Sequence, residues 1–145
     1  MKIVIIDGQG GRMGKAVIEQ LKSSYPELEL YAIGTNSIAT SAMLKAGASY
    51  GATGENPVIV NARNADLIIG PIGIVMADSL MGEITAAMAT AVSSSSAYKI
   101  LIPVNRCNHF IAGCQGGEPT MLLVFMNMET RRYHYQVTCP FRKKA

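Results

Sequence analysis

The sequence predicts an α/β domain built on a mostly parallel sheet, and three observations lead to this prediction. Short aliphatic runs alternate with helical patterns through the first 104 residues. Charged residues make up only 16% of the chain and hydrophobic ones 49%, so the chain must bury a large core. The length of 145 residues suits one domain rather than two marginal ones.

Hydrophobic patterns locate the first two strands and helices. Residues 2–7 are expected to form a buried strand, because their aliphatic run ends at a glycine. From Met13 onward, apolar residues recur at helical spacing until a Ser-Ser-Tyr-Pro sequence. Residues 28–33 predict a second strand and residues 38–45 a second helix, with Ser37 able to act as its N-cap.

The next elements repeat this alternation. A short third strand is expected over residues 48–52. A helix to residue 64 should follow, with Asn56 as its N-cap and Pro57 as its first helical residue. Residues 67–69 predict the fourth strand.

One long helix is expected after the fourth strand. Its apolar stripe at helical spacing comprises Ala77, Leu80, Met81, Ile84, Met88 and Val92. The serines at positions 93–96 should end this helix, and residues 100–104 predict a fifth strand. Together the elements predict a Rossmann-like, doubly wound, mostly parallel sheet of about five strands with helices on both faces.

The C-terminal part has a different pattern. Residues 121–126 form an apolar run, and residues 133–139 alternate apolar with polar side chains. Both patterns indicate strands, so we expect a hairpin that turns over residues 127–132 and pairs with the edge of the sheet. We treat residues 118–145 as a divergent C-terminal segment of the single domain, whose basic end should fray.

The loop between the first strand and the first helix has the glycine pattern of an anion-binding turn. Small residues let backbone N–H groups approach a ligand, and a helix N-terminus carries partial positive charge. Gly8 can make the tight turn, Gly10 and Gly11 can admit a pyrophosphate, and Gly14 can let the helix pack closely on the strand. The loop therefore predicts binding of a dinucleotide or another nucleotide, with a turn that serves packing alone as the alternative.

A phosphate loop of the Walker A type is excluded. Gln9 stands where that loop needs its first glycine, and Ala16 stands where it needs a magnesium-binding hydroxyl. For the dinucleotide loop, a bulky residue in place of Gly11 is expected to abolish binding without unfolding the chain.

The sequence from Val4 to Gly14 resembles the cofactor loop of bacterial dihydrodipicolinate reductases, a strand followed by Gly-x-x-Gly-Arg-Met-Gly. The resemblance covers about the first 35 residues, and the His-His-x-x-Lys catalytic motif of those enzymes does not occur in this chain. In that family the first glycine, the Arg and the Met contact the nicotinamide cofactor. The resemblance implies these contacts for Gly8, Arg12 and Met13. Arg12 would face a 2′-phosphate or pyrophosphate, and Met13 would cover an apolar ring.

To about Gly113 the chain is also similar to a family of short uncharacterised bacterial proteins, a domain-of-unknown-function family. This second resemblance implies no activity. The motifs that carry it are Asp7-Gly-Gln-Gly-Gly11, Gly34-Thr-Asn36, Gly51-Ala-Thr-Gly-Glu55, Gly70-Pro-Ile-Gly73 and Pro103-Val-Asn-Arg106.

The end of the second strand bears on the choice of dinucleotide. NAD-binding proteins normally place Asp or Glu there to bind the ribose hydroxyls, whereas this chain has only Gly, Thr, Asn and Ser. Without a repelling carboxylate, and with Arg12 available, the sequence favours NADP over NAD. The predicted cofactor-binding residues are Gly8, Gln9, Gly10, Gly11, Arg12, Met13, Thr35, Asn36, Ser37, Gly70, Pro71 and Gly73.

Two further loops should converge on the same edge of the sheet, because ligands bind beyond the carboxyl ends of parallel strands. Gly70 to Gly73 follow the fourth strand, where a tight turn without a ligand is the alternative. Asn105 and Arg106 follow the fifth and are the predicted substrate-binding residues, since Arg106 could hold a carboxylate or phosphate. A solvated or interface arginine is the alternative for Arg106.

No catalytic residue or metal site is assigned from the sequence. Asp78 and Glu83 lie five residues apart, so they are expected on different faces of the long helix. The three cysteines and His109 fit no familiar zinc spacing, and an odd number of cysteines argues against a disulfide framework.

Charge and composition narrow the expected partners. Residues 1–105 carry seven Lys and Arg against eight Asp and Glu, so no basic face for nucleic acid is expected. The N-terminal apolar run is too short for a signal peptide, and no stretch suits a membrane-spanning helix, so we expect a cytoplasmic protein. The low charge content favours a homo-oligomer, such as a dimer.

Our first hypothesis is an NAD(P)-binding protein that acts as a small oxidoreductase or as a cofactor-sensing module. The alternatives are a non-catalytic homo-oligomeric interaction protein and a binder of another phosphate-bearing nucleotide.

Overall fold

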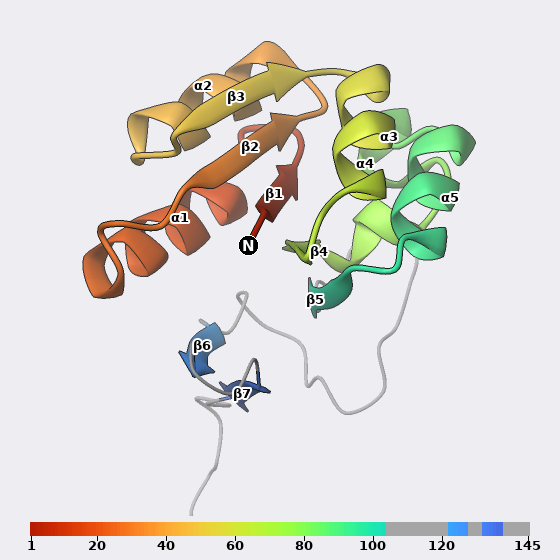
Figure 1. Ribbon diagram of the computed structural model, residues 1–145. Coiled ribbons are helices and arrows are strands. Elements are labelled where there is room, and N and C mark those ends of the chain that lie inside the picture. Colours follow the sequence, from red (N-terminus) through yellow and green to blue (C-terminus); the bar gives the residue numbers. More distant parts are fainter. Residues whose placement is uncertain (104–121, 128–131, 138–145) are drawn as a thin grey trace, which may run out of the picture.

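The computed structural model describes residues 1–103, 122–127 and 132–137, the last two ranges by their backbone alone. Five strands and several short helices alternate along the first range (Figure 1). The strands are β1 (Ile3–Asp7), β2 (Leu30–Gly34), β3 (Tyr50–Thr53), β4 (Leu67–Pro71) and β5 (Tyr98–Ile102). The helices are α1 (Arg12–Ser24), α2 (Ser37–Lys45), α3 (Glu55–Arg63), the 3₁₀ helix η1 (Ile72–Val75), α4 (Ser79–Gly82) and α5 (Ala86–Ser94).

All five strands are parallel and lie in the order β3-β2-β1-β4-β5. Ile3 of the central strand β1 pairs with Leu30 of β2 on one side and with Leu67 of β4 on the other. The chain therefore reverses its direction of winding between β1 and β4. This arrangement confirms the predicted α/β, doubly wound, Rossmann-like fold, and it creates a switch point where crevices for ligands form in such sheets.

Helices cover both faces of the sheet, with α1 and α2 on one side and α3 and α5 on the other (Figure 1). Because side chains of a strand alternate between faces, β1 contributes Ile3 and Ile5 to the first core and Val4 and Ile6 to the second. All of β1 is buried, which explains its unbroken aliphatic sequence.

Two helices begin at other residues than the sequence predicts. Asn36, not Ser37, caps α2, and its side chain accepts a hydrogen bond of 2.9 Å from the N–H of Ala39. Asn36 competes successfully because its extended backbone aims the side chain at the first turn. Helix α3 begins at Glu55 after Gly54, so Asn56 and Pro57 lie within its first turn. Gly54 has a φ of 103°, a conformation that favours glycine over an asparagine cap.

The predicted long helix after β4 is wrong. The chain instead forms η1, a left-handed turn around α4, and then α5. Asp78, Leu80 and Met81 all have positive φ, which a right-handed helix does not allow. The apolar periodicity survives this break because Ile84, and residues of α5 beyond it, still pack against the sheet. The side chain of Thr85 starts α5 afresh by accepting a bond from the N–H of Met88.

The two predicted C-terminal strands are present. Strands β6 (Leu122–Asn127) and β7 (Arg132–Val137) pair in antiparallel register, with Val124 opposite Tyr135. They form a two-stranded sheet of their own, so the predicted pairing with the edge of the main sheet is wrong. Each of the two strands finds its hydrogen-bond partner in the other. Most of the expected turn between them, residues 128–131, lies outside the described residues. The basic end of the chain lies outside them too.

Candidate functional site

Three segments that are far apart in the sequence meet at the carboxyl edge of the sheet. The glycine loop, residues 8–14, follows β1, and Thr35 and Asn36 follow β2. The third segment precedes α5 and contributes Glu83, whose carboxylate contacts both of the other segments. The edge between β1 and β2 therefore carries a cluster of polar groups.

The glycine loop turns tightly before α1. The N–H of Gly11 donates to the carbonyl of Gly8 at 2.9 Å, and Gly11 has a φ of 65°. A Cβ atom on Gly11 would lie 2.6 Å from the Cα atom of Ala39 in α2. Any side chain there would clash with backbone, so the expectation that a bulky residue at Gly11 leaves the fold intact is wrong.

Gly10 differs from the other glycines of the loop because it is exposed. A Cβ atom on Gly10 would meet only the side chain of Arg12, at 3.9 Å. In the described part of the chain, the N–H groups of Gly10 and Arg12 have no hydrogen-bond partner. These two donors lie at the N-terminal end of α1, where partial positive charge favours an anion.

Asp7, the last residue of β1, lies beneath the loop and was not singled out from the sequence. Its carboxylate is buried and accepts hydrogen bonds from the N–H groups of Gly8 at 2.8 Å and Gly14 at 2.7 Å. Burial raises the pKa of Asp7 above its ordinary value, although these backbone donors act in the opposite direction. The nearby Glu83 carboxylate raises the pKa further. The sequence feature that could have identified Asp7 is its position directly before the first glycine of the loop.

Glu83 is the second acidic residue that sequence analysis did not place at the site. Its Oε2 atom accepts from the N–H of Gln9 at 2.8 Å, from the side-chain amide of Asn36 at 3.1 Å and from the hydroxyl of Thr35. Burial alone would raise the pKa of Glu83, but the three donors outweigh it and lower the pKa below its ordinary value. Glu83 is therefore an ionised carboxylate held against the glycine loop at neutral pH.

The residues predicted at the end of β2 have different positions. Besides Glu83, the side-chain amide of Asn36 reaches the carbonyl of Gln9 at 3.0 Å, so Asn36 joins the loop to α2. The backbone N–H of Thr35 donates to the carbonyl of Asp7 at 3.0 Å. Ser37 is exposed and is the first residue of α2. Thr35 and Asn36 thus lie at the loop, as predicted.

The turn after β4 serves close packing. Gly70 and Pro71 are buried at the end of β4, and a Cβ atom on Gly70 would collide with the carbonyl oxygen of Ile6. Gly73 lies in η1, where its carbonyl accepts a bond of 2.5 Å from the hydroxyl of Ser79. The predicted contact of these residues with a cofactor stays a prediction.

The remaining predicted residues are separated. Arg12 is exposed at the start of α1, whereas Met13 is half-buried and packs against the core beneath α1. Asn105 and Arg106, the predicted substrate-binding pair, lie outside the described residues, as do His109 and the three cysteines.

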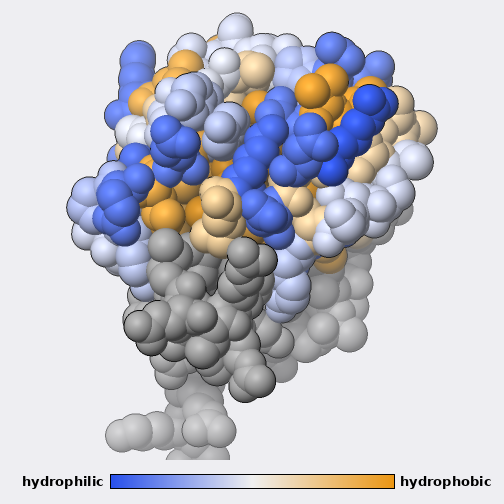
Figure 2. All heavy atoms as spheres, viewed as in Figure 1, coloured by the Kyte–Doolittle hydropathy of each residue, from blue (hydrophilic) through white to orange (hydrophobic). Residues whose placement is uncertain are grey.

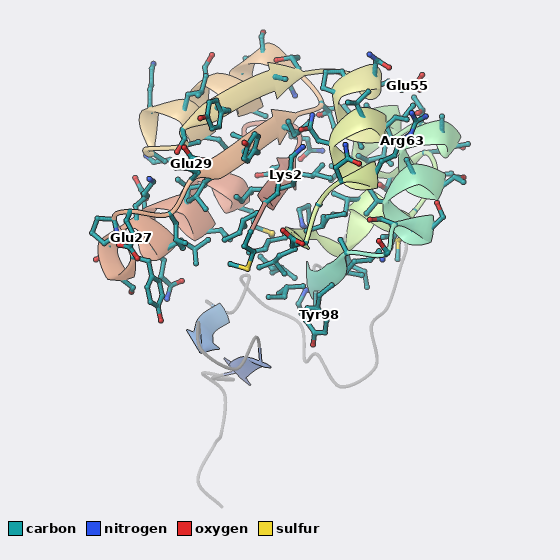
Figure 3. The ribbon with its side chains drawn as sticks, viewed as in Figure 1. Lys2, Glu27, Glu29, Glu55, Arg63 and Tyr98 are labelled. Atoms are coloured by element: carbon teal, nitrogen blue, oxygen red, sulfur yellow. The ribbon has the colours of Figure 1, made fainter. Side chains whose placement is uncertain are left out.

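A concave region lies away from the carboxyl ends of the strands, between α3 and α5. It is an open groove of about 740 Å³ whose walls include Arg63 and the serines at the end of α5. Figure 3 labels Glu55 and Arg63 at the two ends of α3, which forms one wall. No residue of the glycine loop lines this groove.

Two other kinds of feature are absent from the residues that the structure describes. No group of three or more His, Cys, Asp or Glu side chains there could hold a metal ion. In the same residues, no helix combines the length and the apolar character needed to cross a membrane.

Comparison with protein families assigns the chain to one family. A family model described as Domain of unknown function (DUF3842) matches residues 2–134. The chain belongs to this family. The match includes the whole parallel sheet and continues through β6 into β7. No curated protein and no solved structure is significantly similar to the chain.

Proposed function

We propose that the protein binds a nicotinamide dinucleotide, NAD or NADP, at the carboxyl edge of its parallel sheet. One observation carries this proposal. The glycine loop lies at the switch point between β1 and β4 and offers the N–H groups of Gly10 and Arg12 at the start of α1. A pyrophosphate would accept from these donors, and the exposed Arg12 guanidinium would supply charge.

Binding of a dinucleotide suits two kinds of function. A small oxidoreductase and a cofactor-sensing module both need the same loop. The partner is a small phosphate-bearing molecule rather than nucleic acid, since acidic and basic residues nearly balance over residues 1–105. A cytoplasmic location is part of the proposal.

A thermal-shift titration of the full chain with NAD, NADH, NADP, NADPH, ATP and AMP tests the proposal. A dinucleotide at 100 times its Kd should stabilise the fold by about 2.7 kcal/mol. In Gly10→Val, the added Cβ atom would meet no backbone atom within 4 Å. This variant should unfold at nearly the wild-type temperature and lose the shift. Absence of a shift with every dinucleotide, or a full shift in Gly10→Val, would refute the proposal.

A second candidate, a homo-oligomeric interaction protein, is favoured by exposed apolar side chains. The side chain of Met81 is 90% exposed and that of Ile38 is 69% exposed. Figure 2 shows apolar residues interspersed with hydrophilic ones over one face of the molecule. A second copy of the chain could bury these side chains, which would remove their apolar surface from water.

A further inference from the structure

The end of β2 lacks an acidic residue in the sequence, but the fold supplies one from elsewhere. Glu83 is 47 residues beyond Asn36, and the turn around α4 brings its carboxylate to that residue. The same oxygen atom also accepts from Thr35, which directly follows β2, and from the N–H of Gln9 in the glycine loop. A carboxylate therefore stands between the loop and the end of β2.

This is the place where NAD-binding sheets of the same strand order hold their ribose. In those proteins an acidic residue at the end of the second strand accepts hydrogen bonds from the ribose hydroxyls. We infer that Glu83 takes over this task and makes the site select NAD over NADP. The inference rests on the proposed function and deepens it, because it names the residue that sets the choice of dinucleotide.

Contact with the glycine loop and backbone hydrogen bonds around α4 hold Glu83 in place. A Cβ atom on Gly8 would lie only 2.6 Å from its Oε2 atom, so the carboxylate is in close contact with the loop. Around α4, the N–H of Asp78 donates to the carbonyl of Ile84 at 2.8 Å, and that of Ile84 donates to the carbonyl of Ser79 at 3.3 Å. These bonds fix the backbone on both sides of Glu83.

Charge explains the selection. A 2′-phosphate carries nearly two negative charges at neutral pH, and at this place it would meet an ionised carboxylate. The donors of Gln9, Thr35 and Asn36 already bind Glu83, so they could not neutralise a phosphate without releasing it. A ribose hydroxyl, by contrast, is a donor and gains an acceptor. Asp7 cannot substitute, since its carboxylate is buried beneath the loop and binds Gly8 and Gly14.

The sequence favours NADP for two reasons, the absence of a repelling carboxylate near the end of β2 and the presence of Arg12. Glu83 removes the first reason, and the proposed function assigns the Arg12 guanidinium to the pyrophosphate. Sequence distance concealed it, because a residue before α5 comes to β2 only through the break in the predicted long helix.

The test compares dissociation constants for NAD and NADP, measured by calorimetric titration of the full chain. The variants are Glu83→Gln, which removes the charge, and Glu83→Asp, which retains it on a shorter side chain. Glu55→Gln is the matched control, because Glu55 also accepts a hydrogen bond from a threonine hydroxyl, that of Thr85, but lies at the start of α3. Unfolding temperatures without ligand establish that each variant is folded.

Wild type and Glu55→Gln should bind NAD at least about tenfold more tightly than NADP. Glu83→Gln should lose at least about tenfold of this preference, mainly through tighter binding of NADP, and Glu83→Asp should restore part of it. A tenfold change is about 1.4 kcal/mol.

Three results would overturn the inference. Wild-type preference for NADP would contradict it, as would an unchanged preference in Glu83→Gln. Equal tightening of both dinucleotides in Glu83→Gln would show instead that Glu83 merely obstructs the loop. In all three results the proposed function stands, since a dinucleotide binds. Failure of both dinucleotides to bind any of the four proteins would refute the proposed function and the selection together.

Discussion

Two carboxylates accept hydrogen bonds from the same glycine loop, and their environments differ. Asp7 is buried under the loop, where desolvation raises its pKa, whereas Glu83 lies at the surface of the loop, where donors lower its pKa. The loop is thus held partly by the protein's own acceptors. Of the loop's backbone N–H groups, only those of Gly10 and Arg12 are left for an external anion.

Asp7 should give the fold a characteristic pH dependence. Because its native pKa is raised, the native state keeps this proton to a higher pH than the unfolded state does. Stability from this group is therefore present in acid and falls as pH rises from about 4, the ordinary pKa of Asp, through the native pKa. The unfolding free energy of wild type minus that of Asp7→Asn should decrease over that range in urea titrations. Parallel pH profiles of the two proteins would contradict the burial of a titrating Asp7.

At the scale of elements, the turn around α4 determines which side chains reach the glycine loop. It replaces the middle of a predicted helix, and its left-handed residues direct Leu80 and Glu83 to the loop. A helix through the same residues would have carried Glu83 along the sheet instead of to the end of β2. The strain of this turn is therefore associated with the placement of Glu83.

The turn predicts an unusual effect of glycine. Met81 has a φ of 61° and an almost fully exposed side chain, so Met81→Gly should relieve backbone strain and lose few contacts. We expect a stabilisation of about 1 kcal/mol, measured by chemical denaturation. The control Ser41→Gly changes an exposed residue within α2 and should destabilise by about 0.5 kcal/mol. Destabilisation by Met81→Gly would contradict the left-handed turn or reveal a packing partner for Met81.

At the scale of the whole molecule, the open question is whether copies of the chain associate. Charged residues are few, and large apolar side chains such as those of Met81 and Ile38 are exposed. We expect light scattering to give at least twice the mass of one chain, and Ile38→Asp to reduce it, because a buried unpaired charge is costly at an interface. A monomeric wild-type protein would exclude the homo-oligomer.

The parallel sheet could be predicted because the sequence pattern that specifies each strand spans only a few neighbouring residues. Each buried strand is a short aliphatic run, and each run is followed by small residues and a helical pattern, so β1 and the loop after it were located almost to the residue. Thr35 and Asn36 were likewise placed at the site, because the carboxyl ends of neighbouring parallel strands lie side by side.

The sequence by itself determined the α/β class, the strand alternation and the glycine loop, since propensity and hydrophobic period act over a few residues. Only the tertiary structure decided which residues meet at that loop. Periodicity cannot distinguish one helix from two helices joined by a left-handed turn when the apolar residues of both face the same sheet. Asp7 was buried and Glu83 was brought to the end of β2 by long-range packing, and the acceptor of the proposed ribose site depends on that packing.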